Sequence, residues 1–393
     1  MTIDTANSLL IRGVEEIIVK DELEKKLKDG KKLRIKYGVD PTRPDIHLGH
    51  TAVLLKLKKF QEDGHTIIFL IGDYTTKIGD PSGRNTTRPI LSDEEIKTNA
   101  ETYFEQVGRI LDTEKTEVRY NSEWFSKMDP AEIFKFAAKF TLQQIIERDD
   151  FQKRLKSGSD IALPELFYPA MQAYDSIMLK SDVEIGGTDQ KFNMLAGRSL
   201  QKKMNQPSQD VITIKILIGT DGKQKMSKSL GNYIAITDAP TDMFGKIMSI
   251  PDNLIKDYYE LCTEISDEEL KNIESKTLDK PRESKAELAK IIVEMYHSKE
   301  DAEKAAGEFD RVFKNREKPS EIPEINIKES ECRIDDLLVK CELATSKSEA
   351  RRLIEQGAVE IEGKKITESD KVIQIKDEMI VHVGKRRFIK VRK

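Results

Sequence analysis

The sequence is short of cysteine, of net charge and of long apolar runs, and each shortage excludes a class of protein. Its three cysteines, at Cys262, Cys332 and Cys341, are too few and too scattered for a disulfide framework, and no Cys-x-x-Cys pair offers a zinc site. No apolar run is long enough to span a membrane, and the N-terminus lacks the apolar core of a signal peptide. We therefore expect a cytoplasmic protein with no membrane role and no bound zinc or other protein-held metal.

The charge balance excludes a globally basic nucleic-acid binder. Charged residues make up 35% of the chain, yet the formal net charge is only −4. Any contact with RNA must therefore come from a local basic surface. With 393 residues, 38% of them hydrophobic, the chain is long enough for two or three domains.

Strand, loop and helix patterns alternate through the first part of the chain. Leu33 to Val39 and Thr66 to Ile71 have the β-branched, apolar composition of buried strands. Between them, Leu48 to about Glu62 has apolar residues at helical spacing, which predicts a crossover helix joining two parallel strands. Further elements are predicted for a helix-like N-terminus up to Gly30, helices from Ser92 to about Leu111, Pro130 to Arg148 and about Asp189 to Lys203, and strands Asp182 to Ile185 and Val211 to Ile218.

Composition changes divide the chain into four parts. Residues 1–219 are predicted to form an α/β domain around a doubly wound parallel sheet. Residues 220–316 are mostly helical and rich in Lys and Glu, and 317–330 is a linker containing Pro and Glu. Residues 331–393 return to mixed helix and strand, and end in a basic tail that includes Lys385 and Arg386.

The first strand is followed by residues suited to a phosphate chain. Asp40-Pro41-Thr42 makes a rigid turn, and His47 and His50 frame Gly49 where the crossover helix begins. Free amide groups and the helix dipole attract anions there, and two imidazoles on one helical face can donate hydrogen bonds to phosphate oxygens. An isolated His-x-Gly-His is about as often a surface helix start with incidental histidines.

A second pattern, Lys225-Met226-Ser227-Lys228-Ser229, follows the last predicted strand. Its two lysines can neutralise the β- and γ-phosphates of a nucleotide and then release pyrophosphate if the loop is mobile. Alone, such a run is more often a solvated loop. Together and in this order, His47 to His50 and Lys225 to Ser229 resemble the paired signatures of class I aminoacyl-tRNA synthetases.

Residues between the two signatures supply polar groups for an amino acid. Tyr168, Gln172 and Asp175 lie at helical spacing on one face. The turn Gly186 to Gln190 brings Asp189 and Gln190 to the crevice, and the loop Ile78 to Arg84, just after Thr75, adds Asp80 and Arg84. An ammonium group needs an anion and a phenol needs an acceptor, so the converging carboxylates Asp80, Asp175 and Asp189 suit an amino acid with a hydroxylated ring.

These strings resemble tyrosyl-tRNA synthetases over nearly the full chain. The resemblance implies a Rossmann-like catalytic domain (1–219), a helical anticodon-binding region (220–316) and a small α+β, S-four-like RNA-binding domain (331–393). It implies ATP with Mg²⁺, tyrosine and tRNA(Tyr) as substrates, and a homodimer. The implied catalytic residues are His47, His50, Lys225 and Lys228; the ATP site adds Asp40, Thr42, Gly49, Asp189, Met226 and Ser227; the tyrosine site comprises Thr75, Asp80, Tyr168, Gln172, Asp175 and Gln190; and the RNA contacts are Lys347, Arg351 and Arg352.

One position departs from the family pattern. Many tyrosyl enzymes have a tyrosine on the first strand that bonds the substrate phenol, where this chain has Lys36. Strand side chains alternate, so Tyr37 is expected to face away from Lys36 and to pack as a strand aromatic. The role of Lys36 is left open by the sequence, as are two alternatives for the whole chain: a small-molecule nucleotidyltransferase and a non-catalytic RNA-binding protein with a synthetase fold.

Overall fold

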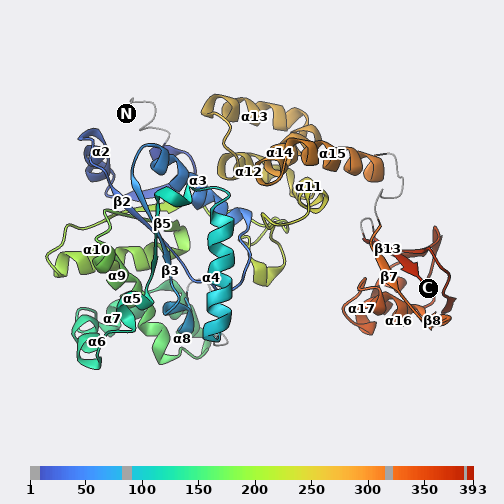
Figure 1. Cartoon of the computed structure of the whole chain (residues 1–393), viewed down its shortest axis with the longest axis horizontal. Helices are drawn as coiled ribbons and strands as arrows, with labels where there is room; N and C mark the ends of the chain where they lie inside the picture. Colours follow the sequence, from blue (N-terminus) through green and yellow to red (C-terminus); the bar gives the residue numbers. More distant parts are fainter. Residues whose placement is uncertain (1–8, 82–90, 315–321, 385–386) are drawn as a thin grey trace. The chain divides into compact units, whose positions relative to one another are not determined.

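The computed structural model describes residues 9–81, 91–314, 322–384 and 387–393. It consists of two compact units, Met1–Ala306 and Gly307–Lys393, which are taken separately below (Figure 1). Of the predicted features, Arg84, Lys385, Arg386 and residues 317–321 of the linker lie outside the described residues.

A six-stranded sheet organises the first unit. Its strands are β1 (Val14–Ile18), β2 (Arg34–Val39), β3 (Thr66–Ile71), β4 (Thr116–Tyr120), β5 (Val183–Gly187) and β6 (Asp210–Ile214), in the order β1-β6-β5-β2-β3-β4. All neighbours are parallel except β1 and β6, which are antiparallel. The chain builds outward from β2 through β3 to β4 and then returns to add β5 and β6 on the other side. The predicted doubly wound sheet is confirmed, and its order reverses between β2 and β5.

Helices connect and cover these strands. They are α2 (Lys20–Lys28), α3 (Leu48–Glu62), α4 (Asp93–Val107), α5 (Ser122–Phe125), α6 (Pro130–Ala137), α7 (Leu142–Ile146), α8 (Asp149–Ser157), α9 (Tyr168–Leu179) and α10 (Lys191–Lys203). The predicted crossover helix α3 is confirmed, as is the start of α4, where Ser92 and Glu95 form a reciprocal capping box. Helices α9 and α10 pack side by side (Figure 1).

Three sequence predictions need correction, and one strand was missed. The N-terminal segment contains the strand β1 as well as helix, β4 was not predicted, and β6 ends at Ile214 instead of Ile218. The helix expected from Pro130 to Arg148 is broken, because the side chain of Thr141 caps a new helix, α7. Phe140, within the break, packs against apolar clusters that include residues of α9.

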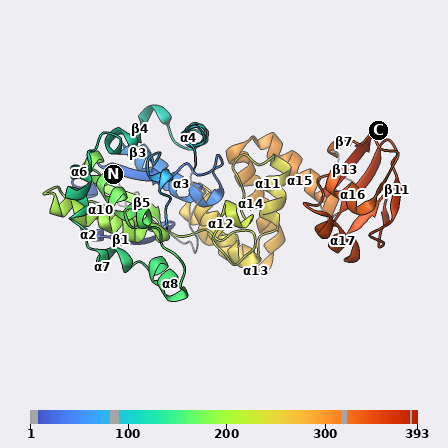
Figure 2. The same cartoon turned by 90° about the horizontal axis from the view of Figure 1, so that it is seen from below.

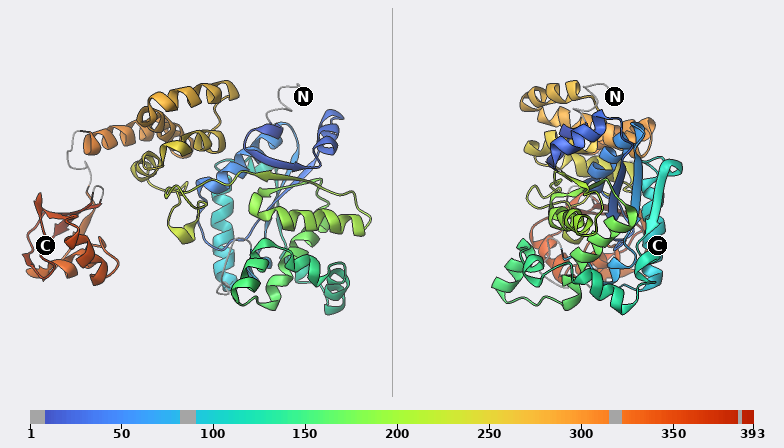
Figure 3. Two further views of the ribbon diagram at one scale, coloured as in Figure 1. Left: turned by 180° about the vertical axis from the view of Figure 1, so that it is seen from behind. Right: turned by 90° about the vertical axis from the view of Figure 1, so that its left-hand side faces the viewer.

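The predicted helical region follows the sheet. Its helices are α11 (Pro240–Met248), α12 (Ile255–Cys262), α13 (Asp267–Asp279), α14 (Pro281–Tyr296) and α15 (Lys299–Phe313). Within residues 241–314 the described chain contains no strand, as expected. Figure 2 shows α11 to α14 gathered in one group, and Figure 3 shows it from behind in yellow and orange. In the part of the chain that is described, no helix has the length and apolar character needed to cross a membrane.

The second unit is a small α+β fold. Two helices, α16 (Ile334–Lys340) and α17 (Lys347–Glu355), accompany the strands β7 (Glu324–Asn326), β8 (Glu331–Arg333), β9 (Val359–Ile361), β10 (Lys364–Lys365), β11 (Val372–Gln374), β12 (Met379–Val383) and β13 (Arg387–Arg392). Five strands form the sheet β10-β9-β12-β13-β7, and β11 pairs with β8. Leu337, Leu338 and Val381 are fully buried in its own apolar core, so this unit has the core that an independent domain requires.

Ser92 provides a test of the local fold. Its hydroxyl accepts a hydrogen bond from the Glu95 backbone N–H at 3.2 Å, so Ser92→Ala is expected to lower the free energy of unfolding by about 1 kcal/mol. Urea denaturation followed by the fluorescence of Trp124, the single tryptophan, measures this loss. Thr98→Ala, at an exposed position within α4, is the control and should change stability by less than about 0.5 kcal/mol. Equal losses at both positions would contradict the capping role.

Candidate active site

A cavity of about 870 Å³ lies at the carboxyl ends of the parallel strands, where the sheet order reverses. This is the edge at which doubly wound sheets bind ligands. All the residues predicted for ATP and tyrosine line it, drawn from segments far apart in the chain: Asp40, Thr42, His47, Gly49, His50, Thr75, Asp80, Tyr168, Gln172, Asp175, Asp189, Gln190, Lys225, Met226, Ser227 and Lys228.

His47 and His50 close the N-terminus of α3 with their own side chains. His47 Nδ1 accepts from the Gly49 backbone N–H, and His50 Nδ1 accepts from the His47 backbone N–H, both at 3.2 Å. Because Nδ1 of each ring is an acceptor, the proton of each neutral imidazole is on Nε2. A Cβ at Gly49 would lie only 3.0 Å from the His47 ring, so a side chain there would displace the imidazole.

Both histidines are held neutral. Burial, followed by the charges of Lys228 and Lys225, lowers the pKa of His50 to about 3. Burial, followed by His50 and Lys228, also takes the pKa of His47 well below its ordinary value. The rings therefore offer neutral Nε2–H donors throughout the physiological range, and they place no positive charge at the site before a ligand binds.

The two lysines of the second signature have different partners. Lys225 Nζ pairs with Asp189 Oδ2 at 2.7 Å, while Lys228 Nζ lies 5.2 Å from the centre of the Tyr103 ring and 3.3 Å from the Arg43 carbonyl oxygen. Burial lowers the pKa of Lys228 to about 8, with a small contribution from Arg43. Both ammonium groups border the cavity, as an anionic ligand would require.

Backbone pairing joins the first signature to the segment that follows the second signature. His47 and Ala235 form an antiparallel bridge, with Leu48 N donating to Ile234 O at 3.0 Å and Ile236 N donating to Ile46 O at 3.0 Å. The signature loop is in turn anchored by Asn232, whose Oδ1 accepts from Ser227 N at 2.8 Å. The two signatures are therefore linked indirectly, through main-chain hydrogen bonds to residues 234–236 and through the side chain of Asn232.

Polar groups from four elements meet on the other side of the cavity. The Tyr168 hydroxyl donates a hydrogen bond to Asp40 Oδ2, and the Thr75 hydroxyl donates one to Asp40 Oδ1, both at 3.0 Å. Gln190 Nε2 donates to Asp80 Oδ2 at 2.7 Å. These contacts bring residues from the ends of β2, β3 and β5 into one hydrogen-bonded wall.

Asp175, on α9, also lines the cavity. It is 3% exposed, and its Oδ1 accepts from the indole N–H of Trp124 at 2.9 Å. Burial raises the pKa of Asp175 to about 7, opposed by the charge of Lys36 and by hydrogen bonds from Trp124 and Asn121. This carboxyl is consequently able to gain or lose a proton near neutral pH.

Lys36 and Tyr37 face opposite sides of the sheet, as alternation predicts. The Lys36 ammonium group contacts α9 and Glu184, whereas the Tyr37 ring packs 6.0 Å from that of Phe69. Tyr37 is buried, as predicted for a strand aromatic, and burial raises the pKa of its phenol. Its ring also borders the cavity.

Sequence reasoning missed three polar residues of this site. Glu184 borders the cavity, Asn193 bonds to Gln172 and Gln190, and Asn121 bonds to Thr75. The sequence did carry one signal, because a glutamate inside a strand predicted to be buried requires a partner. The asparagines carried none, since their partners come from distant segments.

The predicted RNA-contact residues lie on α17 of the second unit. Arg351 Nε pairs with Asp335 Oδ2 at 2.9 Å, and Lys347 pairs with Asp336. Arg352 is exposed. Two of the three cations thus already contact acidic side chains of α16.

Comparison with sequence families identifies two matching segments. Residues 28–314 match the profile of class I tRNA synthetases (W and Y). Residues 315–391 match the profile of the tyrosine–tRNA ligase SYY-like C-terminal domain.

Individual proteins match over the full chain. The tyrosine–tRNA ligase of Thermotoga maritima is 48% identical over 100% of this chain and 98% of its own length. That of Carboxydothermus hydrogenoformans is 50% identical over 98% of this chain and 96% of its own. Among solved structures, the tyrosyl-tRNA synthetase of Archaeoglobus fulgidus, complexed with L-tyrosine, has a TM-score of 0.63 at 27% identity, covering 77% of this chain and 99% of that one.

The raised pKa of Asp175 predicts a pH-dependent stability. The folded carboxyl has a pKa of about 7 against 3.8 for the ordinary group, so between these values the folded state binds more protons than the unfolded state. Wild-type stability should therefore gain from this group as the pH falls from 8 to 5.5. Asp175→Asn, which cannot titrate, should lack that gain.

Urea denaturation of both proteins at the two pH values, followed by circular dichroism, measures the effect. The difference in the free energy of unfolding between variant and wild type should favour the variant more at pH 8 than at pH 5.5. A difference that stays constant, or that changes in the opposite direction, would contradict a raised pKa of Asp175 in the folded protein.

Proposed function

The chain belongs to the tyrosine–tRNA ligases among the class I aminoacyl-tRNA synthetases, and we propose that the cavity described above carries out both steps of their reaction. ATP and tyrosine are joined to give tyrosyl-adenylate and pyrophosphate, and tyrosine is then transferred to the 3′-terminal adenosine of tRNA(Tyr). The supporting observation is the lining of a single cavity by both signatures and by the candidate amino-acid pocket. The relatives that match nearly the whole chain are tyrosine–tRNA ligases, which argues against a small-molecule nucleotidyltransferase.

In the first step, a carboxylate oxygen of tyrosine attacks the α-phosphorus of ATP. A new oxygen–phosphorus bond forms as the bond from that phosphorus to the bridging oxygen breaks, and pyrophosphate leaves with the electron pair. Negative charge grows on the phosphate oxygens, where the neutral Nε2–H groups of His47 and His50 donate. No covalent bond to the enzyme is needed, because positioning and charge stabilisation lower the barrier.

The lysines of the signature loop act on the leaving pyrophosphate. Lys228 borders the cavity from the side of Tyr103, and Lys225 is paired with Asp189. When ATP binds, Lys225 exchanges this partner for the β- and γ-phosphates, which leaves Asp189 to accept from the ribose hydroxyls. Asp40, Thr42, Gly49, Met226 and Ser227 complete the nucleotide site. Mg²⁺ enters with ATP as part of that substrate.

The amino-acid pocket binds both ends of tyrosine, the phenol and the ammonium and carboxylate groups. Asp175 accepts a hydrogen bond from the phenol hydroxyl. The ammonium group is held by Tyr168, Gln172 and Asp80. Gln190 and Thr75 lie toward the carboxylate. A buried acceptor for the hydroxyl is left unpaired by phenylalanine, which disfavours that competitor.

For the transfer step we place the catalytic domain at 1–219, an anticodon-binding region at 220–316, a linker at 317–330 and an RNA-binding domain at 331–393. Lys347, Arg351 and Arg352 contact RNA phosphates. Because Lys347 and Arg351 already pair with α16, RNA binding exchanges one anionic partner for another at these two positions.

We further propose a homodimer that acts in the cytoplasm. Four large apolar side chains from the segment between β4 and β5, Phe134, Leu142, Leu155 and Leu163, are between 53% and 70% exposed. Covering such side chains with a second copy would remove their apolar surface from water. Light scattering that returns the mass of one chain would refute the dimer.

Exchange of labelled pyrophosphate into ATP, driven by each amino acid in turn, tests the activity. Tyrosine should support exchange and tryptophan should not. Exchange with tryptophan alone would overturn the assignment, and failure with every amino acid would favour a non-catalytic RNA-binding protein.

His47 variants separate catalysis from helix capping in the same assay. His47→Ala removes both the Nε2–H donor and the cap of α3, whereas His47→Asn keeps a side chain suited to capping. If the donor acts on phosphate, both variants should lower kcat by about 100-fold with little change in the KM for tyrosine. Only His47→Ala should also lower the melting temperature, and full activity of His47→Asn would remove His47 from the catalytic residues.

Arg352 tests the RNA-binding role of the second unit. Arg352→Ala should leave pyrophosphate exchange unchanged but weaken tRNA binding, and should reduce the slope of log affinity against log salt concentration by about 1. Charging assays across a salt series measure this slope. Lys20→Ala, an exposed lysine on α2, serves as the control, and an unchanged slope for Arg352→Ala would place the RNA elsewhere.

A further inference from the structure

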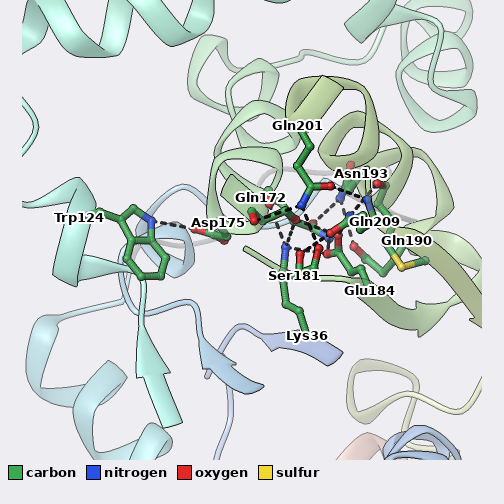
Figure 4. A network of polar contacts seen from close by, with 12 residues as sticks. Lys36, Trp124, Gln172, Asp175, Ser181, Glu184, Gln190, Asn193, Gln201 and Gln209 are labelled. Carbon is green, nitrogen blue, oxygen red and sulfur yellow. Dashed lines mark hydrogen bonds and ion pairs between the residues drawn. The ribbon is translucent and has the colours of Figure 1, made fainter. Parts of the chain in front are cut away.

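The structure places a buried ion pair in the lining of the cavity, at the point where the sheet order reverses. Lys36 and Glu184 are register partners on the parallel strands β2 and β5. Their side chains are 0% and 3% exposed, and Lys36 Nζ lies 2.8 Å from Glu184 Oε1 (Figure 4). Two charges this deep are costly unless they are paired and fully hydrogen-bonded.

All three protons of the Lys36 ammonium group have acceptors within the protein. They are Glu184 Oε1 at 2.8 Å, the Ser176 hydroxyl at 2.9 Å and the Gln172 carbonyl oxygen at 3.0 Å. An ammonium group has three donors and no acceptor. Lys36 therefore has no proton left for a substrate phenol, and it does not take over the bond made by the tyrosine that many relatives have at this position.

Glu184 is saturated in the same way. Its Oε1 accepts hydrogen bonds from Lys36 and, at 3.1 Å, from the Gln172 amide nitrogen. Its Oε2 accepts from the Ser176 hydroxyl at 3.2 Å and from the Gln209 amide. A carboxylate has about four acceptor sites and no donor. Gln172 must therefore turn its NH₂ group toward Glu184 and its carbonyl oxygen away (Figure 4).

The orientation set at Gln172 continues along a chain of amides. Asn193 Nδ2 donates to Gln172 Oε1 at 2.9 Å and to Gln190 Oε1 at 3.1 Å. Gln190 Nε2 then donates to Asp80 Oδ2 at 2.7 Å. At Asn193 itself, the donor-only Arg148 contacts Oδ1 at 2.7 Å, which fixes that amide as well.

We propose that Lys36 and Glu184 are positioning residues for the amino-acid pocket, which hold the carbonyl oxygen of Gln172 toward the substrate ammonium group. The inference rests on the proposed function, because it takes Gln172 and Asp80 as the ammonium site. A carbonyl oxygen has two acceptor sites and Asn193 uses one, so one site remains for a donor of the ligand, since Gln172 lines the cavity. Lys36 balances the charge that makes Glu184 an obligate acceptor.

The double variant Lys36→Met/Glu184→Gln tests this role without leaving a lone buried charge. The amide introduced at position 184 can meet Gln172 as donor or as acceptor, so the side chain of Gln172 loses its single orientation. Calorimetric titration should then show about 10-fold weaker binding of tyrosine and of tyramine, both of which carry the ammonium group. Binding of 3-(4-hydroxyphenyl)propionate, which lacks it, should weaken less than binding of tyrosine and tyramine, because loss of the Lys36 charge also acts on Asp175. The KM for ATP should stay as in wild type.

Gly197→Ala perturbs the same network while keeping both charges. A Cβ at this position in α10 would lie 2.7 Å from Gln209 Nε2 and 2.9 Å from the Ser176 hydroxyl, so the two donors to Glu184 Oε2 must shift. The same selective loss of the ammonium-bearing ligands is expected. The control is Arg154→Met/Glu165→Gln, which removes another buried ion pair, 1% and 8% exposed, that does not line the cavity; it should leave all three affinities unchanged.

Two results would overturn the proposal. Equal weakening of all three ligands would show that the pair only packs the site, and a changed preference for tyrosine over phenylalanine with no ammonium effect would show that it acts on Asp175. The proposed function fails separately, when the wild-type protein binds tyrosine but supports no tyrosine-dependent pyrophosphate exchange.

Discussion

The parallel pairing of β2 with β5 is the constraint on which the rest of the structure depends. The chain adds β3 and β4 on one side of β2 and β6 on the other side of β5, so connections leave the sheet in opposite directions from this pair. A crevice opens where they separate, and both signatures and the polar wall converge on it. The same pairing sets Lys36 beside Glu184, so one register positions both the opening of the site and the ion pair in its lining.

The parts of the fold that could be predicted are those whose burial leaves a pattern in the sequence. The interior strands β2, β3, β5 and β6 are rich in buried apolar residues, because they are covered on both faces. Both missed strands, β1 and β4, lie at the edges of the sheet. They mix charged and apolar residues, since each pairs with one neighbour only and is partly exposed. Their backbone pairing, which no side-chain pattern records, places them in the sheet.

The residues of the site can likewise be divided into those that the sequence could predict and those that it could not. The sequence does reveal the two signatures, His47 to His50 and Lys225 to Ser229, because each is a continuous segment whose neighbouring residues already indicate its chemistry. The hydrogen-bond chain through Glu184, Asn193 and Gln190 could not be predicted, because it depends on which amide faces which acceptor across three elements. Lys36 shows the limit most clearly: its sequence position marks it as unusual, and only its three acceptors explain what it does.

The saturation of the Lys36–Glu184 pair has a consequence for any attempt to alter the amino-acid selectivity of this protein. The two positions must be changed together. A neutral residue at either one alone would leave an unpaired charge in the interior, so single variants would misfold before their selectivity could be measured. Directed evolution that randomises both codons together would reach pockets that stepwise libraries cannot.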